Sequence, residues 1–146
     1  MSKEFEAFVN KHVKLRFFSP RELLFKGASH YKRGSRSFGL NTDPPRELWE
    51  SILPTIKILD EFRGKLDAPV RILSAYRSPE YNRSIDGALR SQHTAFAAID
   101  FTSPRGTPKM WAQELKEMRH EGDFSGGIGI YSNFVHVDTR GWNADW

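Results

Sequence analysis

The sequence predicts an α+β fold, in which a small and mostly antiparallel β-sheet is flanked by helices. Three observations predict it: apolar residues at helical spacing dominate the first half, short β-prone runs gather in 70–138, and polar turn residues separate the last two of these runs. A length of 146 residues is that of one domain with a sizeable core. We therefore expect a single domain over residues 1–146, with 1–40 as an N-terminal segment of helix and loop.

The N-terminal segment is predicted to contain two helices. The first is marked by apolar residues at helical spacing, namely Phe5, Phe8 and Val9. Residues 15–18 are β-prone and predict a short strand. Ser19 then starts the second helix, because a proline follows it and a glutamate stands three residues later, as in a capping box. Residues 27–41 hold few apolar side chains and are expected to form a loop.

Residues 43–63 are predicted to form the longest helix. Its apolar face is marked by residues spaced three or four apart: Leu48, Ile52, Ile56, Leu59 and Phe62. Pro54 lacks the N–H of an internal helical hydrogen bond, so we expect the helix to bend there. Gly64 and Pro69 end this helix and lead into the next element.

Strands and helices alternate in the second half of the chain. The expected elements are strands at 70–74 and 97–101 and helices at 78–85 and 108–120. Ser78 caps the first of these helices, with a proline at the first helical position. Two β-prone runs, 128–131 and 134–138, flank the polar pair Ser132-Asn133 and predict a terminal hairpin.

The composition excludes several classes of protein. Hydrophobic residues make up 38% and charged residues 27% of the chain, as in soluble globular proteins and unlike disordered ones. No apolar run approaches the roughly 18 residues of a membrane span, and the polar N-terminus lacks the apolar core of a secretory signal. Because the chain has no cysteine, disulfide scaffolds and thiol nucleophiles are excluded too. We expect synthesis in the cytoplasm, no membrane insertion and a monomer.

The net charge of +4 favours an acidic partner, which would be nucleic acid, an anionic membrane surface or an anionic cell-wall polymer. The basic residues are spread along the chain, and the densest stretch, 32–36, is too short for a nucleic-acid-binding arm. We therefore expect no nucleic-acid partner. A small basic nucleic-acid-binding protein with incidental histidines stays an alternative, which predicts strongly salt-dependent DNA binding.

His93, Asp100 and His136 supply two imidazoles and one carboxylate, each beside a short β-prone run. Three protein ligands of mixed nitrogen and oxygen type, with a fourth position left for water, are typical of a catalytic zinc. A structural zinc more often has four ligands, usually including the thiolates that this chain lacks. We therefore expect these residues to bind Zn²⁺ and the chain to be a metal-dependent hydrolase. Taken singly, each of them is more often a surface residue or a satisfied polar contact.

Two patterned stretches contain these residues: Ser91-x-His93-x-x-x-x-Ala98-x-Asp100 and His136-x-Asp138. They resemble the zinc-site motif of the M15 peptidases, the family of D-Ala-D-Ala carboxypeptidases and murein endopeptidases. That motif is Ser-x-His-x-x-Gly-x-Ala-x-Asp, with a histidine on a late strand as the third ligand. Residues 72–78, 81–93 and 126–138 are similar to the same family, the last of them to its branch of small periplasmic murein endopeptidases and phage lysis enzymes. The resemblance extends from Phe18 to Trp142 and implies a hedgehog/DD-peptidase-like fold with Zn²⁺ as cofactor.

Two positions depart from the family pattern. Phe96 stands where the motif has its central glycine; a phenylalanine at positive φ would be strained, so we expect the loop to differ locally. Asn133 stands three residues before the last ligand, where some branches carry a catalytic Glu or Asp. An amide cannot accept a proton from water at neutral pH. The base must therefore come from elsewhere, or the metal must do most of the activation.

Asp138 is the preferred candidate for the catalytic base, because strand alternation places it on the same face as His136. Two other roles stay open for it: orienting a ligand imidazole through its second N–H, or forming a structural salt bridge. Asp123, in a glycine-rich loop, is a weaker candidate base. Arg77 follows a predicted strand, where side chains commonly line a cleft. There it would stabilise the oxyanion or hold a substrate carboxylate, and the resemblance implies the same role.

Ser91, Gln92 and Tyr131 are the candidate substrate-binding residues. Tyr131 and Trp142 are expected to wall the groove, although both are equally compatible with core or edge packing. Ser91 alternatively only holds the turn before His93. The glycines of the late strand indicate a bulge or a close approach of substrate: Gly126, Gly127 and Gly129.

The resemblance implies a zinc peptidase that hydrolyses peptide bonds in peptidoglycan stem peptides or cross-links. We expect a phage-type endolysin or a cell-wall remodelling enzyme, which reaches the wall without a Sec signal, by phage lysis or as part of a virion. The alternative, motivated by Asn133, is a catalytically weak or inactive metal-stabilised domain that binds the cell wall or the virion.

Overall fold

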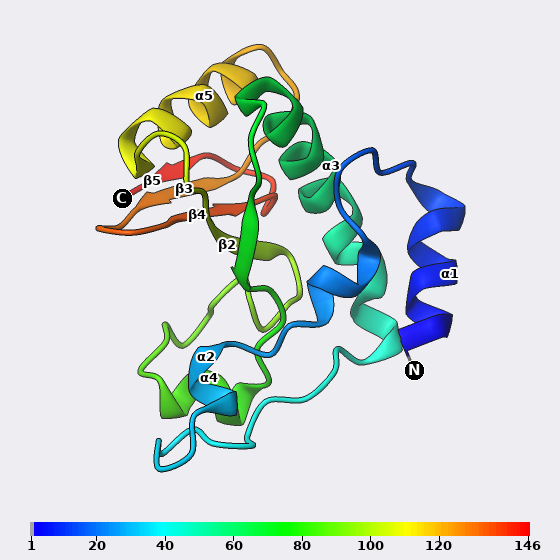
Figure 1. The fold of residues 1–146 in the computed structure, drawn as a ribbon, viewed down its shortest axis with the longest axis vertical. Coiled ribbons are helices and arrows are strands. Elements are labelled where there is room, and N and C mark those ends of the chain that lie inside the picture. Colours follow the sequence, from blue (N-terminus) through cyan, green and yellow to red (C-terminus); the bar gives the residue numbers. More distant parts are fainter. Residues whose placement is uncertain (1) are drawn as a thin grey trace.

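A five-stranded sheet forms the centre of the computed structural model, which describes residues 2–146 (Figure 1). Its strands are β1 (Arg71–Ser74), β2 (Ala98–Thr102), β3 (Gly127–Ile130), β4 (Val135–Asp138) and β5 (Ala144–Asp145). Across the sheet they run in the order β1, β2, β4, β3, β5. All neighbours are antiparallel except β3 and β5, which are parallel. Since helices accompany a mostly antiparallel sheet, the predicted α+β class is confirmed.

Helices of different lengths pack around the sheet. They are α1 (Ser2–His12), α2 (Ala28–Tyr31), α3 (Trp49–Leu66), α4 (Pro79–Ser84) and α5 (Pro108–His120), with the 3₁₀ turns η1 (Pro20–Leu24) and η2 (Arg46–Leu48). The long helix α3 lies against the sheet, α1 lies on the outer side of α3, and α5 lies beside β3 (Figure 1). The short helices α2 and α4 lie together at the end of the molecule remote from α5. None of the helices within residues 2–146 has the length and apolar character that a bilayer crossing requires.

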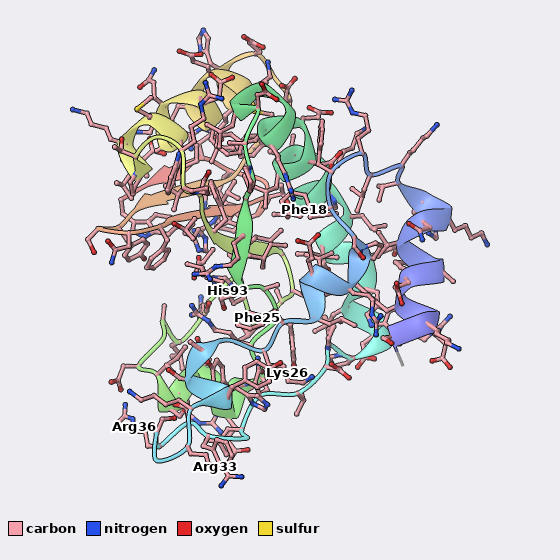
Figure 2. All side chains as sticks on the ribbon, viewed as in Figure 1. Phe18, Phe25, Lys26, Arg33, Arg36 and His93 are labelled. Atoms are coloured by element: carbon pink, nitrogen blue, oxygen red, sulfur yellow. The ribbon has the colours of Figure 1, made fainter. Side chains whose placement is uncertain are left out.

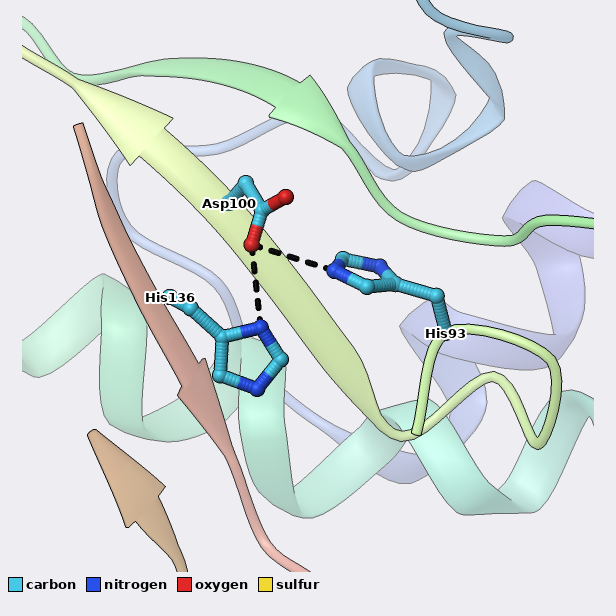
Figure 3. Close-up of side chains that lie close together, drawn as sticks. All are labelled: His93, Asp100 and His136. Carbon is cyan, nitrogen blue, oxygen red and sulfur yellow. Dashed lines mark hydrogen bonds and ion pairs between the residues drawn. The ribbon is translucent and has the colours of Figure 1, made fainter. Parts of the chain in front are cut away.

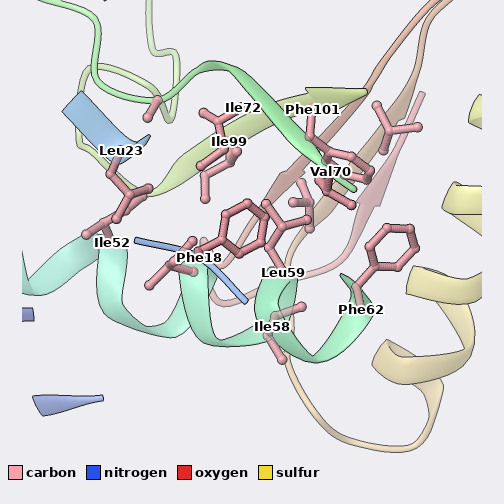
Figure 4. Packing of buried hydrophobic residues seen from close by; sticks show 14 of the residues in the cluster. Phe18, Leu23, Ile52, Ile58, Leu59, Phe62, Val70, Ile72, Ile99 and Phe101 are labelled. Carbon is pink, nitrogen blue, oxygen red and sulfur yellow. The ribbon is translucent and has the colours of Figure 1, made fainter. Parts of the chain in front are cut away.

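The hydrophobic core fills the space between α3 and one face of the sheet (Figure 4). Fully buried side chains of α3 meet fully buried side chains of β2 there: Ile52, Leu59 and Phe62 from the helix, Ile99 and Phe101 from the strand. Phe5 and Val9 of α1 extend the core on the far side of α3. The apolar stripe predicted for the long helix is therefore the face that packs against the sheet.

Capping residues set the starts of two helices. Ser78 and Thr107 precede α4 and α5, and the side-chain oxygen of each accepts a hydrogen bond from the backbone N–H three residues later, at 3.1 and 3.3 Å. A proline follows each cap, at the first helical position, where the helix does not use the missing N–H. The predicted helix at 108–120 is confirmed with the same bounds, and the one at 78–85 is confirmed to within one residue at each end.

Residues 15–18 do not form the predicted strand. Their backbone N–H groups turn toward α3, where the carboxylate of Asp60 accepts hydrogen bonds from Arg16, Phe17 and Phe18 at 3.0, 2.9 and 3.2 Å. The prediction was wrong because this β-prone run has no strand beside it. One buried carboxylate on the helix satisfies the N–H groups that a neighbouring strand would otherwise satisfy.

Three other elements differ from the prediction. The long helix starts later than predicted, behind the separate turn η2, and ends later, at Leu66; Pro54 lies inside it. The short helix α2 interrupts the loop expected at 27–41. The prediction lacks β5, because a strand of two residues carries no periodicity.

Strand β4 separates the two faces of the sheet. Val135 and Val137 belong to the core, and His136 and Asp138 point to the opposite face, as the alternation along a strand predicts. In the pairing of β4 with β2, His136 stands opposite Asp100. The polar residues of the two strands therefore meet on the face that is turned away from the core.

Candidate metal centre

The three predicted metal ligands lie together on this polar face (Figure 3). Asp100 Oδ1 is 3.0 Å from His93 Nε2 and 3.0 Å from His136 Nδ1. One potential ligand atom from each residue lies within 4.8 Å of the other two. Strands β2 and β4 carry Asp100 and His136, and the turn before β2 carries His93. All three side chains are buried, with exposed fractions between 2% and 7%.

The second nitrogen of each imidazole is fixed by a hydrogen bond to the protein. His93 Nδ1 donates to the backbone carbonyl oxygen of Ala75 at 2.7 Å, and His136 Nε2 donates to Asp138 Oδ2 at 2.7 Å. Each ring therefore turns a nitrogen lone pair toward Asp100, which offers an oxygen lone pair. Three lone pairs that face one another need a proton or a cation between them. This donor set of two imidazoles and one carboxylate fits a zinc ion with an open coordination position.

Burial and charge act on these groups in opposite directions. Burial lowers the pKa of His93, although Asp100 opposes the shift, so this imidazole is neutral at pH 7 and able to bind metal. Burial acts to lower the pKa of His136 as well, but hydrogen bonds to Asp100 and Asp138 raise it. Burial would raise the pKa of Asp100, but the two imidazoles hold it well below its usual range. A metal ion at this site therefore competes with a proton at His136.

Asp138 is completely buried beside His136, and both of its oxygens are occupied. Oδ1 accepts hydrogen bonds from the backbone N–H of Gly127 and from Arg140 Nε, each at 2.9 Å. Oδ2 accepts the bond from His136 and another from Arg140 Nη2 at 2.8 Å. Burial would raise the pKa of Asp138, but these bonds hold it well below its usual range. These contacts are those of a group that orients His136, and Asp138 does not line the cavity described below.

Arg77 contacts the other oxygen of Asp100. Its Nη2 lies 3.1 Å from Asp100 Oδ2, while Nε donates to Ser74 Oγ at 3.2 Å and Nη1 to Asn82 Oδ1 at 3.3 Å. Arg77 thus holds the Asp100 carboxylate in one orientation and balances its charge. The guanidinium also lines the cavity, so its remaining N–H groups are able to reach a ligand.

A cavity of about 470 Å³ opens onto the three grouped side chains. One of its lining residues is His93, which lies between the sheet and the part of the chain that carries Arg33 and Arg36 (Figure 2). The lining includes all the predicted substrate-binding residues: Ser91, Gln92 and Tyr131. The Ser91 hydroxyl also accepts a hydrogen bond from the backbone N–H of His93 at 3.2 Å, so it holds the turn as well.

Three other residues singled out in the sequence lie outside this cavity. Asp123 lines a different cavity of about 840 Å³, beside α1 and α3. Asn133 is exposed, and its backbone carbonyl oxygen accepts a hydrogen bond from Thr102 at 2.9 Å. Trp142 lies outward, with its ring centroid 5.8 Å from the Arg140 guanidinium. None of the three brings a polar group to the metal centre.

Phe96 adopts a φ of +55°, in the left-handed region that favours glycine. It lies in the turn between His93 and β2, where its N–H donates to the carbonyl oxygen of His93 at 3.1 Å. The expectation that the loop differs locally is therefore wrong, because the backbone takes a positive φ with phenylalanine in place of glycine. The ring is completely buried, with the ring centroids of Phe5 and Tyr76 each 6.0 Å away. This burial offsets the backbone strain of about 1–2 kcal/mol.

Two residues of the site, Arg140 and Trp146, were not predicted from the sequence. The signal for Arg140 was available, because the alternation that pairs His136 with Asp138 extends by two positions to it. Trp146 lines the cavity, with its ring centroid 5.0 Å from that of His136. No pattern indicates this position, since it depends on the two-residue strand β5 and on the missing side chain at Gly129.

A model of the peptidase M15 family matches residues 25–138 of the chain. The matched span is well over half of the sequence and contains all three grouped side chains. No curated protein and no solved structure matches the chain at a significant level.

Proposed function

Since the chain belongs to the M15 peptidase family, we propose that it is a zinc-dependent peptidase acting on bacterial peptidoglycan. The observation that carries the proposal is the buried group of His93, Asp100 and His136, which opens onto a cavity. In this proposal the three residues hold Zn²⁺. The bonds hydrolysed are peptide bonds of the stem peptides or of the cross-links between them.

In this proposal the role of the protein is to hold the metal-binding atoms in fixed directions. Each ligand has its own supporting group: the Ala75 carbonyl for His93, Arg77 for Asp100 and Asp138 for His136. Ligands held in this way need little reorganisation when the metal or the substrate binds. When bound, zinc would lower the pKa of a water toward about 7, and it would also polarise the scissile carbonyl.

We assign Asp138 to the orientation of His136 rather than to proton transfer, because both of its oxygens are occupied within the protein. Among residues 2–146, the side-chain carboxylates that line the cavity are those of Asp86 and Asp100 alone. Asp86 is ion-paired with Arg36 at 2.7 Å. The proposed mechanism therefore has no separate carboxylate base, and activation of the water rests mostly on the metal.

Arg77 has two roles in the proposal. It positions Asp100, and its remaining N–H groups stabilise the oxyanion that develops on the scissile carbonyl. Gln92 and Tyr131 contact the peptide on either side, since both line the same cavity. Ser91 keeps the turn of His93 in place and stands next to the substrate.

The proposed substrate, peptidoglycan, also suggests a biological role for the protein. A net charge of +4 favours adhesion to an anionic cell wall. We propose a phage-type endolysin or a cell-wall remodelling enzyme that acts as a monomer, with peptides rather than nucleic acid as its partner.

Digestion of purified peptidoglycan tests the proposal. Zinc-loaded protein should release soluble stem peptides, a chelator should stop the release, and added zinc should restore it. His136→Ala should release none. His120→Ala changes an exposed histidine that does not line the cavity and serves as the matched control with full activity. Mass spectrometry of the muropeptides identifies the bond, and a zinc-saturated protein that releases nothing contradicts the proposal.

A metal-stabilised binding domain without turnover is the second candidate. One observation favours it: neither Asn133 nor a free carboxylate of the described chain stands at the metal centre. This candidate predicts one equivalent of bound zinc and sedimentation with cell walls, but no released peptide.

A further inference from the structure

We infer that Trp146 and Arg140 form a binding subsite beside the metal centre, which receives a carboxylate of the peptide substrate. The inference rests on the proposed peptidase function and deepens it, because it states which group of the peptide lies next to the scissile bond. Three observations carry it: the position of the indole, the way the ring is fixed, and the free guanidinium N–H groups in the same cavity.

The indole of Trp146 takes the place of a side chain that β3 lacks. Across the sheet, Asp100 on β2 stands opposite His136 on β4, which stands opposite Gly129 on β3. A Cβ on Gly129 would lie 2.5 Å from Trp146 Nε1, so only glycine leaves room for the ring. The ring centroids of Trp146 and His136 are 5.0 Å apart. The indole therefore continues the polar row and forms the cavity wall next to a proposed ligand.

Contacts on several sides fix this ring. The backbone N–H of Trp146 donates to the carbonyl oxygen of Ile128 at 3.2 Å, and its own carbonyl oxygen accepts from the N–H of Ile130 at 2.8 Å. Indole Nε1 donates to the hydroxyl of Tyr131 at 2.8 Å, and the Arg140 guanidinium lies 5.3 Å from the ring centroid. Even so, 47% of the residue is exposed. A fixed, half-exposed indole in a cavity is a preorganised surface for a ligand.

Arg140 adds a hydrogen-bond donor of fixed direction. Its Nε and Nη2 are bonded to Asp138, while Nη1 has no hydrogen-bond partner within residues 2–146. Arg90 lines the same cavity and makes no ion pair in this part of the chain. Both side-chain carboxylates of the lining are already paired: Asp86 with Arg36 and Asp100 with Arg77. The cavity therefore offers an incoming carboxylate the free Nη1 of Arg140, whose charge Asp138 balances, and the unpaired charge of Arg90.

Kinetics of the zinc-loaded full chain test the role of the indole. Trp146→Leu should raise KM for a synthetic stem peptide about tenfold, equivalent to 1.4 kcal/mol, with a smaller change in kcat and unchanged zinc content. Trp146→Phe keeps an aromatic ring, so its KM should lie between those of the unaltered protein and Trp146→Leu. Trp142→Leu is the matched control, since Trp142 also contacts Arg140 but lies outside the cavity. An unchanged KM in Trp146→Leu, or an equal rise in Trp142→Leu, overturns the inference.

Amidated peptides test the carboxylate. One probe is amidated at its side-chain carboxylates and another at its C-terminus, so the two arms identify which carboxylate is bound. With the unaltered protein, the peptide that lacks the bound carboxylate should have a KM about tenfold higher, because one charged contact is lost. Equal KM values for all three peptides contradict the subsite.

A binding measurement separates this inference from the peptidase proposal. In NMR spectra the indole N–H resonance missing from Trp146→Phe belongs to Trp146. It should shift on titration with the free-carboxylate peptide, and less with the amidated form. Hydrolysis without a shift overturns the subsite and leaves the peptidase, whereas a shift without hydrolysis keeps the subsite and defeats the peptidase. Neither shift nor hydrolysis overturns both.

Discussion

The two faces of the sheet are built from the same strands, but different interactions hold them. On the core face, Ile99 and Val137 pack against neighbours that require only apolar surface and a suitable volume. On the other face, Asp100 and His136 are held by hydrogen bonds between particular atoms. Residues that are adjacent along one strand therefore contribute to separate properties. Mutations on the core face should change the free energy of unfolding, and mutations on the polar face should change metal binding.

The largest expected effect is the loss of a ligand from the polar face. His136→Ala removes one of three proposed ligands and should abolish stoichiometric zinc binding, with peptidase activity at background. The chain should stay folded, because its core is untouched. Metal analysis after dialysis, together with circular dichroism, checks both points. One equivalent of zinc retained by this variant would remove His136 from the proposed site.

The next effect comes from the neighbour of Asp100 on the core face. Ile99→Ala should lower the free energy of unfolding by about 3 kcal/mol, because it leaves a cavity beside α3. Urea unfolding of the chelated protein measures this loss, and zinc binding in the absence of urea should stay at one equivalent. A folded Ile99→Ala protein that binds no zinc would show that the two faces are coupled.

A smaller effect is expected from the group that orients His136. Asp138→Asn removes the charge that the imidazole N–H and Arg140 contact, so zinc affinity should fall about 10- to 100-fold. Competition with a chromophoric chelator measures the affinity. At saturating zinc, turnover should remain near that of the unaltered protein. A collapse of turnover with zinc fully bound would instead assign Asp138 to proton transfer.

The smallest expected effect concerns the junction of the two faces, at Phe96. Its ring belongs to the core, while its backbone shapes the turn of His93. Phe96→Ala and Phe96→Gly should both destabilise the fold, but the glycine variant should be the more stable by about 1 kcal/mol, because only glycine adopts a positive φ without strain. Thermal unfolding of the pair measures the difference, and the opposite order would mean that the turn is unstrained.

Local periodicity explains what the sequence could predict. Alternation along 134–138 was enough to place His136 and Asp138 on one face, and capping residues were enough to bound the helix at 108–120. The segment at 15–18 was mispredicted because its partner, Asp60, is remote in the chain. Trp146 could not be predicted, since its position depends on a long-range pairing that involves only two residues of strand.

The packing of α1 over α3 has a practical consequence for anyone who shortens the chain. The family match starts at residue 25, but Phe5 and Val9 lie before it and are completely buried against the outer side of the long helix. A fragment that starts at residue 25 would lack α1 and would expose the apolar outer side of α3 to water. We expect such a fragment to express as aggregates, although it would retain every proposed ligand. The residues matched by the family model are therefore fewer than the residues that we expect to be needed for folding.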